Sequence, residues 1–346
     1  MKAAYIEKFG GPEVLTYGDL PDPVAGPGQV VVDTVAASVN GADPKVAAGE
    51  YKQTKFPLIL GRDFSGKVSA VGEGVTDLKV GDDVFGVLET GRDGTYCEKI
   101  AVGANVVGKK PAALSHVDAA AMALTGLTAI CAVENSLQLK AGETILIQGG
   151  AGGVAAFAIQ LAKHIGARVI STCSTGNLDY VRGLGADEVI DYKTTDFTKV
   201  VKNCDAVFET VGDDVAVRSF AVLKPGGRAT FIASGPTAPK PDRSDVTALR
   251  PAVPRERKYM ERIAELYGKG AVRPQHVTLF ELAKAREALG VSAARHFKGK
   301  LVLKVRSSSS RLELSAARRS GGTCSVDSST RRGPSTMPPV GRRRSG

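Results

Sequence analysis

The stretch Thr144-Ile145-Leu146-Ile147-Gln148-Gly149-Gly150-Ala151-Gly152-Gly153-Val154-Ala155 decides the fold of this chain. Residues with strand character lead into a run of glycines, and a helix with one apolar face follows. Within the stretch, Gly150-x-Gly152-x-x-Ala155 fits the dinucleotide-binding fingerprint, whose third position is Gly or Ala. Gly150 permits the tight turn, Gly152 lets a pyrophosphate approach the backbone, and Ala155 lets the helix pack close to the strand. The phosphates are expected on free N–H groups at the positive end of the helix.

The central part of the chain alternates strands and helices, which is typical of a parallel, doubly wound α/β sheet. Besides the strand that leads into the glycines, strands are predicted at 168–172, 188–191, 206–210 and 228–233. A sixth strand is not clear, because five prolines between residues 235 and 254 reduce that segment to a loop or a very short strand. Helices are predicted at 119–139, 154–165, 255–269 and 280–289.

The N-terminal part has short apolar runs separated by Gly and Pro turn signals, which predicts a barrel-like antiparallel domain. Its strands are expected at 1–7, 29–35, 67–72 and 83–87, and a last strand of the chain at 300–305. The predicted domain organisation has a barrel domain at 1–118 that is completed by 271–305, a dinucleotide-binding domain at 119–270, and a tail at 306–346.

Composition points to an ordinary globular protein. The chain has 346 residues, of which 43% are hydrophobic and 24% charged. We find no run of about 18 apolar residues, so no membrane span is predicted. The N-terminus reads as a strand rather than a signal peptide. Five cysteines are scattered without CxxC spacing, which favours reduced thiols in the cytoplasm over a disulfide frame or a zinc knuckle.

The positive charge of the chain is concentrated at its C-terminal end. Residues 306–346 hold nine arginines against two acids, a net +7, which leaves +3 of the total +10 for the first 305 residues. This segment is rich in Ser, Arg, Gly and Pro, and we expect it to be disordered. Nucleic-acid binding by the rest of the chain therefore has little support.

Six motifs in order give the chain a family resemblance. They are 36–43 (AASVNGAD), 57–66 (PLILGRDFSG), 124–129 (LTGLTA), the glycine loop, 184–192 (LGADEVIDY) and 299–302 (GKLV). Through them the chain resembles the medium-chain dehydrogenase/reductase superfamily, in its zinc-free quinone oxidoreductase and enone (alkenal) reductase branch. The resemblance covers roughly residues 1–305. It implies a GroES-like β-barrel substrate domain wrapped around a Rossmann domain.

The chain departs from the zinc-dependent members of this superfamily at their metal ligands. Those members place a Cys where Asn40 stands and Gly-His-Glu where Gly61-Arg62-Asp63 stands. An amide and a guanidinium cannot replace a thiolate and an imidazole on zinc. Only Cys97 lies in the region of the four-cysteine structural zinc lobe. The sequence predicts no metal at either position.

The residues after the second strand favour NADPH over NADH. An NAD site needs an acidic residue about 20 positions past the loop, but no carboxylate appears before Asp179. The hydroxyl of Ser174 and the amide of Asn177 can donate to a 2′-phosphate, although ordinary turn chemistry also explains them. Tyr192 matches a family position near that phosphate. Cofactor contacts are expected at Gly150, Ala151, Gly152, Gly153, Val154, Ser174, Asn177, Tyr192, Val211, Ser234 and Gly235.

The expected reaction is hydride transfer from C4 of NADPH to a quinone, or to the β-carbon of an α,β-unsaturated aldehyde or ketone. By family position, the candidate catalytic residues are Asn40, Tyr51 and Thr125, which would stabilise the oxyanion that forms. Each has a plainer reading: Asn40 as a backbone cap, Tyr51 as a packing residue, and Thr125 as a helix cap. Asp43 is expected to orient its loop.

Other assignments carry less support. The four histidines, His116 and His164 among them, are expected on the surface, and no hydrolase arrangement is apparent. Two alternatives stay open: a trans-acting enoyl reductase of a biosynthetic pathway, and a non-enzymatic relative with a structural or RNA-binding role. The resemblance suggests a homodimer that pairs the Rossmann sheets through the edge at 228–233.

Overall fold

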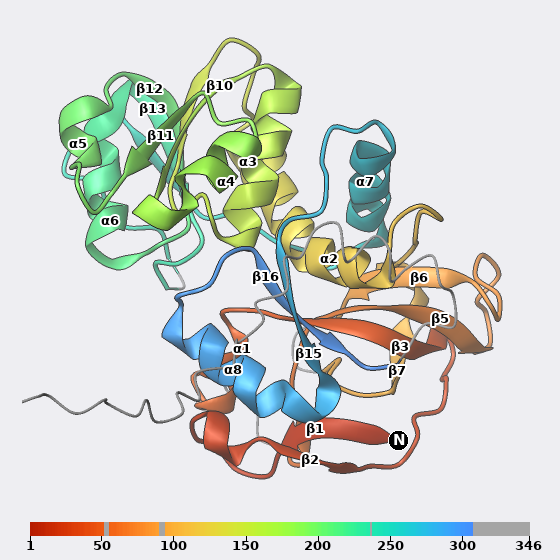
Figure 1. Cartoon of the computed structure of the whole chain (residues 1–346). Helices are drawn as coiled ribbons and strands as arrows, with labels where there is room; N and C mark the ends of the chain where they lie inside the picture. The colour runs from red at the N-terminus through yellow and green to blue at the C-terminus, as the bar shows by residue number, and fades with distance from the viewer. Residues whose placement is uncertain (52–54, 90–93, 236, 307–346) are drawn as a thin grey trace, which may run out of the picture.

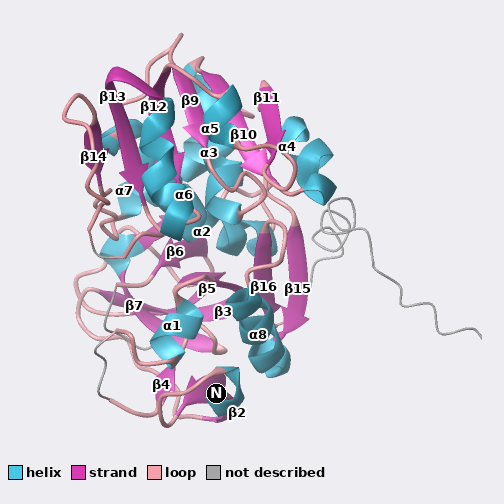
Figure 2. Cartoon of the chain, turned by 90° about the vertical axis from the view of Figure 1, so that its left-hand side faces the viewer, coloured by secondary structure: helices cyan, strands magenta, loops and turns pink. Residues whose placement is uncertain are grey.

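The structure is a computed structural model that describes residues 1–51, 55–89, 94–235 and 237–306. The chain forms two bodies of sheet and helix that meet along α2 (His116–Ile130), and Figure 2 shows one above the other. The predicted basic tail lies outside the described residues from 307 onward.

The upper body is built on a six-stranded sheet in the order β11-β10-β9-β12-β13-β14, and every neighbouring pair is parallel. Its strands are β9 (Thr144–Ile147), β10 (Arg168–Cys173), β11 (Glu188–Asp191), β12 (Cys204–Glu209), β13 (Leu223–Phe231) and β14 (Thr247–Leu249). The strand order reverses beside β9, and such a reversal is where dinucleotides bind in doubly wound sheets. The predicted Rossmann fold is therefore confirmed, and the doubtful sixth strand exists as three residues.

Helices cover both faces of this sheet (Figure 1). They are α3 (Gly153–Ile165), α4 (Leu178–Gly183), α5 (Phe197–Val200) and α6 (Asp213–Arg218), whereas α7 (Arg257–Gly268) packs against α2 and against β8 (Val107–Lys109) of the lower body. One continuous helical stretch, His116–Ser136, has the length and composition to cross a membrane, but 89% of that window is buried inside the protein. Its apolar character follows from packing between the two bodies: Ala120 and Ala121 lie against Ala36 and Val302.

The lower body is a barrel-like, mainly antiparallel arrangement, as predicted for a GroES-like domain. Its large sheet runs β15-β16-β3-β5-β6-β8, with β7 paired to β3, and a small sheet runs β2-β1-β4. The large sheet comprises β3 (Gln29–Val39), β5 (Asp63–Val71), β6 (Asp83–Val87), β7 (Lys99–Gly103), β8 (Val107–Lys109), β15 (Val277–Glu281) and β16 (Lys300–Lys304). The small sheet and its neighbours comprise β1 (Lys2–Ile6), β2 (Thr16–Asp19), β4 (Leu58–Ile59), α1 (Asp43–Ala47) and α8 (Ala285–Ala294).

The last strand joins the first part of the chain, because β16 pairs antiparallel with β3, with Leu301 opposite Val39. We therefore propose that 1–118 and 271–305 form one domain and 119–270 the other.

Two predictions from the sequence were wrong. The segment predicted as a helix at 280–289 starts inside β15, which ends at Glu281, and the helix α8 begins only at Ala285. The strand at 228–233 is not the sheet edge, because β14 pairs with β13 and forms that edge.

The two domains are joined by backbone contacts at the glycine loop. The N–H of Gly299 donates to the carbonyl of Ala151 at 2.8 Å, and Gly299 forms a parallel β-bridge with Gly152. The residue after Gly299 opens β16, so the strand of one domain starts on the cofactor loop of the other. This contact fixes where the side chains of β16 lie relative to the loop.

Gly299 cannot carry a side chain without disturbing this joint. Its φ is +70°, and a Cβ there would lie 2.0 Å from the carbonyl oxygen of His276. We expect Gly299→Ala to lower the free energy of unfolding by about 2 kcal/mol or more, through backbone strain and the clash. Urea denaturation measures this.

Gly290 in α8 provides the matched control, because a Cβ there meets nothing within 4 Å. Gly290→Ala should leave stability unchanged or raise it slightly, since Ala is the better helix former. Equal stability of the Gly299→Ala protein and the wild type would contradict this description of the joint.

Candidate functional site

The glycine loop has the geometry that a dinucleotide needs. A Cβ at Gly150 would lie 2.3 Å from the Ser171 Oγ, whereas one at Gly152 meets only the Gly149 carbonyl oxygen, at 3.3 Å. Gly152 is the N-cap of α3, and no side chain caps the first amides of that helix. The loop thus combines a tight turn with an open backbone and unpaired N–H groups, which fit a pyrophosphate.

The end of the second strand presents hydroxyl and amide groups. The Nδ2 of Asn177 donates to the Oγ of Ser174 at 2.9 Å, which leaves the Ser174 hydroxyl proton free to donate. The side chain of Asp179 is 99% exposed and is paired with Arg182, so it points away from this turn. Sequence reasoning missed Asp191 at the end of β11, whose carboxylate accepts from Thr175 Oγ1 at 2.6 Å. A carboxylate therefore lies close to the expected phosphate position.

The remaining predicted cofactor residues also lie at the carboxyl edge of the Rossmann sheet. Tyr192 follows β11 and is exposed. Val211 follows β12, and its N–H donates to the buried carboxyl of Glu209 at 2.5 Å. Ser234 and Gly235 follow β13, and the Ser234 Oγ is buried without a partner. All of them are thus on the side of the sheet where α/β folds bind ligands.

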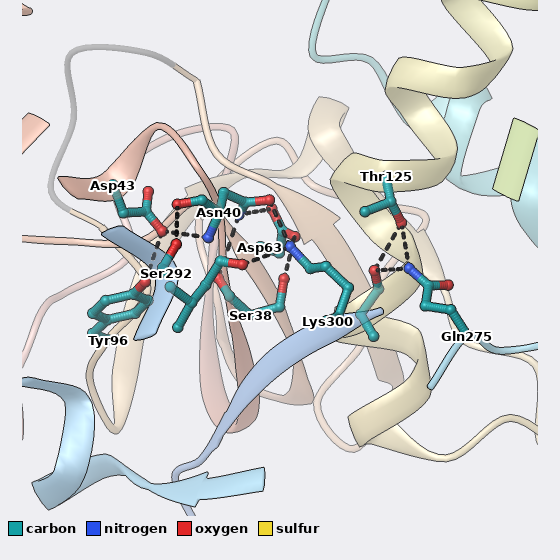
Figure 3. A network of polar contacts seen from close by, with 11 residues as sticks. Ser38, Asn40, Asp43, Asp63, Tyr96, Thr125, Gln275, Ser292 and Lys300 are labelled. Carbon is teal, nitrogen blue, oxygen red and sulfur yellow. Dashed lines mark hydrogen bonds and ion pairs between the residues drawn. The ribbon is translucent and has the colours of Figure 1, made fainter. Parts of the chain in front are cut away.

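A buried polar network stands next to the loop, centred on Lys300 (Figure 3). The Lys300 Nζ donates to the Val39 carbonyl at 2.8 Å and to the Asn40 Oδ1 at 2.7 Å, and it lies 3.8 Å from the Asp63 Oδ2. The Asn40 Nδ2 donates to the Asp63 Oδ1 at 3.2 Å. The amide of Asn40 is therefore engaged on both sides within the protein. Burial raises the pKa of Asp63 and lowers that of Lys300, and each charge opposes the shift of the other.

A second carboxylate, Asp43, holds the Asn40 end of this network. Its Oδ2 accepts from the backbone N–H of Asn40 at 2.8 Å and from the Tyr96 hydroxyl at 2.7 Å. Burial raises the pKa of Asp43 to about 6, against the effect of these hydrogen bonds, and also raises that of Tyr96. These contacts fit the expectation that Asp43 orients its loop.

Thr125 lies within α2 rather than at a helix start, so the capping alternative was wrong. Its hydroxyl donates to the Ala121 carbonyl at 2.8 Å and accepts from Gln275 Nε2 at 3.0 Å. Its methyl group faces the glycine loop, because a Cβ on Gly153 would lie 3.0 Å from Thr125 Cγ2 and 2.8 Å from Lys300 Cδ. Thr125 and the stem of Lys300 thus line the start of α3 with apolar atoms.

Two other predicted residues have different surroundings. Tyr51 is 47% exposed, and its hydroxyl makes no hydrogen bond within the described part of the chain. His116 was expected on the surface, but it is buried: its Nδ1 lies 2.8 Å from the Ser65 Oγ and its Nε2 3.5 Å from Asp83. It therefore belongs to the contact between α2 and the barrel.

The residues at the metal positions of zinc relatives do not suit zinc. Asn40 is hydrogen-bonded to an ammonium group and to Asp63, and the residue directly before Asp63 is Arg62, a guanidinium in place of an imidazole. Within the described ranges, no group of three or more His, Cys, Asp or Glu side chains could hold a metal ion.

Sequence reasoning did not select Lys300 or Asp63 as site residues. The signal for both was a charged residue at the start of a strand with a buried apolar run, which is rare in a buried sheet unless the charge is paired. Both positions were noticed only as parts of motifs, and their proximity depends on the pairing of β16 with β3.

The fold and the site together define an oxidoreductase with a nicotinamide-dinucleotide domain and a GroES-like domain. Two family models agree: an alcohol dehydrogenase GroES-like domain matches residues 26–112, and a zinc-binding dehydrogenase domain matches residues 184–303. The chain belongs to the medium-chain dehydrogenase/reductase superfamily, in the zinc-free quinone and enone reductase branch.

Relatives with curated names place the chain within that branch. It is 31% identical to a mitochondrial NAD(P)H oxidoreductase, RTN4IP1, of Danio rerio, over 88% of this chain and 91% of that protein. It is 32% identical to the chloroplastic NADPH-dependent alkenal/one oxidoreductase of Arabidopsis thaliana, over 88% and 79%. The solved quinone oxidoreductase of Coxiella burnetii superposes with a TM-score of 0.83 at 31% identity, over 88% and 99%.

The raised pKa of Asp43 makes stability depend on pH. The folded state holds the proton more tightly than the unfolded chain, so the cost of ionising Asp43 grows as pH rises from about 4 to about 6 and is constant above. We expect Asp43→Asn to gain stability relative to wild type across this window, by at most about 3 kcal/mol at about 1.4 kcal/mol per pKa unit.

Urea unfolding at pH 4.5, 5.5, 6.5 and 7.5 measures the difference between the two proteins. Asp179→Asn serves as control, because that carboxylate is exposed and its variant should show no such trend. A stability difference for Asp43→Asn that stays constant with pH would show that Asp43 ionises normally.

Proposed function

We propose that this protein is an NADPH-dependent, zinc-independent reductase that transfers hydride to a quinone or to the C=C bond of an α,β-unsaturated aldehyde or ketone. The observation that carries the proposal is the contact of Gly299 with Ala151, since it sets the buried network of Lys300 and Asn40 directly on the cofactor loop. The names of the quinone and alkenal/one oxidoreductase relatives support the same reaction class.

The residues present have distinct parts in such a reaction. NADPH, when bound, supplies the hydride. The loop amides from Ala151 to Val154 would hold its pyrophosphate, and the carboxyl ends of β12 and β13 would lie along the rest of the cofactor. Thr125 and the Lys300 stem give this place an apolar wall against Gly153. A water-poor wall strengthens electrostatic effects on an oxyanion that forms there.

The polar residues of the site differ in whether they have a proton left to donate to a ligand. Asn40 cannot offer a free amide proton, because Asp63 and the Ser38 carbonyl accept from its Nδ2. The Lys300 ammonium has three protons and donates to two acceptors within the protein; its third N–H makes no hydrogen bond to Asp63, which lies 3.8 Å away, and would donate to an oxygen of a ligand. Tyr51 would supply a second donor, its phenolic hydroxyl, from the exposed side.

The preference for NADPH rests on the second strand. Ser174 and Asn177 have one free hydroxyl proton and one free amide proton for a 2′-phosphate, and Asp179 is turned away. Asp191 acts against this preference, because its charge would repel a phosphate; its hydrogen bond from Thr175 spreads that charge.

We place the protein in the cytoplasm as a homodimer. The thiols of Cys97, Cys131, Cys173 and Cys204 are buried, and none of them forms a disulfide within the described residues, as expected in a reducing compartment. The free edge for pairing two Rossmann sheets is β14 rather than β13. The named relatives include mitochondrial and chloroplastic proteins.

The reaction is tested by following NADPH oxidation with a 1,4-quinone, a 2-alkenal, a 2-enone and an enoyl thioester. Turnover of the quinone, the alkenal or the enone is expected, with saturated carbonyl or hydroquinone products. Turnover of the thioester alone would support the enoyl-reductase alternative, and no turnover with any compound would remove the proposal.

Cofactor choice is tested by Ser174→Asp. A carboxylate at this turn repels a 2′-phosphate and accepts from a ribose 2′-hydroxyl, so kcat/KM for NADPH should fall tenfold or more relative to NADH. Asp191→Asn should act in the opposite direction, because it removes the nearby negative charge. If neither substitution changes the ratio, the 2′-phosphate does not bind at this turn.

A further inference from the structure

We propose that Gln148 is a positioning residue for the cofactor, because its buried side chain fixes the backbone of the glycine loop. This inference rests on the proposed binding of a nicotinamide dinucleotide and names the residue that prepares its pyrophosphate site. Gln148 directly precedes the glycine run and is only 1% exposed. It follows β9, which lies between β10 and β12 in the sheet, so its side chain can reach groups on both sides.

The amide oxygen of Gln148 holds the loop through Thr172 of β10. The Gly149 N–H donates to the Thr172 Oγ1 at 3.2 Å, and that hydroxyl donates to the Gln148 Oε1 at 2.6 Å. A backbone N–H can only donate, so the single proton of the hydroxyl is directed to Gln148. Gln148 therefore keeps the Thr172 oxygen in the orientation that binds the Gly149 N–H inside the protein.

The amide nitrogen of Gln148 is fixed by Ser219, at the start of the short helical turn Ser219–Val222. It donates to the Ser219 Oγ at 3.3 Å, and that hydroxyl donates onward to the Val215 carbonyl at 2.7 Å. Because the Ser219 proton is already used, its oxygen can only accept from Gln148. This settles which end of the Gln148 amide faces Ser219, and the oxygen end is left for Thr172.

The backbone at Gln148 and Gly149 is held from the β12 side as well. The Thr210 hydroxyl donates to the Gln148 carbonyl at 2.8 Å. Gly149 has a φ of +70°, and a Cβ there would lie 2.9 Å from the Thr210 Oγ1. Gly149 is thus packed between one threonine of β10 and another that follows β12.

The contacts of Gly149 continue into the rest of the loop. The Gly150 N–H donates to the Thr172 carbonyl at 2.8 Å, and the Gly152 N–H donates to the Gly149 carbonyl at 2.9 Å. The amides of these three glycines are therefore used within the protein. The first amides of α3 are left for the pyrophosphate, since a helix start has no intrahelical partners for them.

Glycines have the largest conformational freedom of all residues, so a loop of four needs an external constraint to keep one shape. Without the Gln148 carboxamide, the Thr172 hydroxyl loses its acceptor in a buried place and has to turn toward another one. The Gly149 N–H then loses its partner, and the loop becomes free to take other conformations. The cofactor would have to order the loop when it binds, which lowers its affinity.

The test measures the dissociation constants of NADPH and NADH by fluorescence titration of the full chain. Gln148→Met keeps the length of the side chain and removes both polar atoms, so both constants should rise about tenfold. They should rise in equal proportion, because the two cofactors share the pyrophosphate. Thr172→Val should act like Gln148→Met, whereas Thr172→Ser keeps the hydroxyl and should stay within about twofold of wild type.

The double variant Gln148→Met/Thr172→Val tests whether the two side chains act as one chain of hydrogen bonds. If they do, it should bind at most about twofold more weakly than either single variant, whereas independent losses would multiply to about a hundredfold. Gln160→Met is the matched control, because this buried glutamine of α3 bonds to the backbone of Arg273 instead. It should change neither constant by more than about twofold. Urea unfolding verifies that each variant is folded.

Several results would overturn the inference. One is wild-type affinity of Gln148→Met for both cofactors, and another is a multiplied loss in the double variant. A loss confined to NADPH would show that Gln148 and Thr172 act on the Ser174 turn, and an equal loss in Gln160→Met would show general destabilisation. A wild-type protein that binds neither cofactor would remove the proposed function, and this inference with it.

Discussion

The active region depends on one backbone contact, the hydrogen bond from Gly299 N–H to the Ala151 carbonyl. It attaches Gly299, the residue directly before the barrel strand β16, to the loop that would hold the cofactor. Glycine is needed on each side of this joint. Gly299 has a positive φ, and a Cβ on Gly153 of the loop would collide with the Lys300 side chain. The site is thus built by two domains that meet with almost no side chain between their backbones.

A second constraint follows from the burial of charge at this joint. Lys300 and Asp63 are 4% and 0% exposed, and both lose hydration in the folded state. Their cost is offset by a set of hydrogen bonds through Asn40, Ser38 and Val39. The sequence resemblance aligns Asn40 with a Cys of the zinc-dependent members. In this chain the amide of Asn40 accepts a hydrogen bond from the Lys300 ammonium.

The sequence predicted the elements that depend on local patterns. The glycine loop, the parallel strands after it and the Ser174 turn follow from periodicity and from residues with special backbone freedom. The sequence did not show which polar atoms would be engaged within the protein. Asn40 was chosen as a donor, but its amide is satisfied by Lys300 and Asp63, which lie 260 and 23 residues away. Thr125 was chosen for its hydroxyl, yet its methyl group faces the loop. Such long-range pairings come from the register of β16 against β3, which no local pattern encodes.

We propose that the Lys300 ammonium and the cofactor loop form one active site. The most direct measurement is single-turnover hydride transfer by Lys300→Met, with NADPH affinity determined separately by fluorescence. Methionine keeps the apolar stem against Gly153 and removes the charge, so we predict near-normal NADPH binding and a hydride-transfer rate at least tenfold lower. A variant that binds NADPH and transfers hydride at the wild-type rate would contradict it.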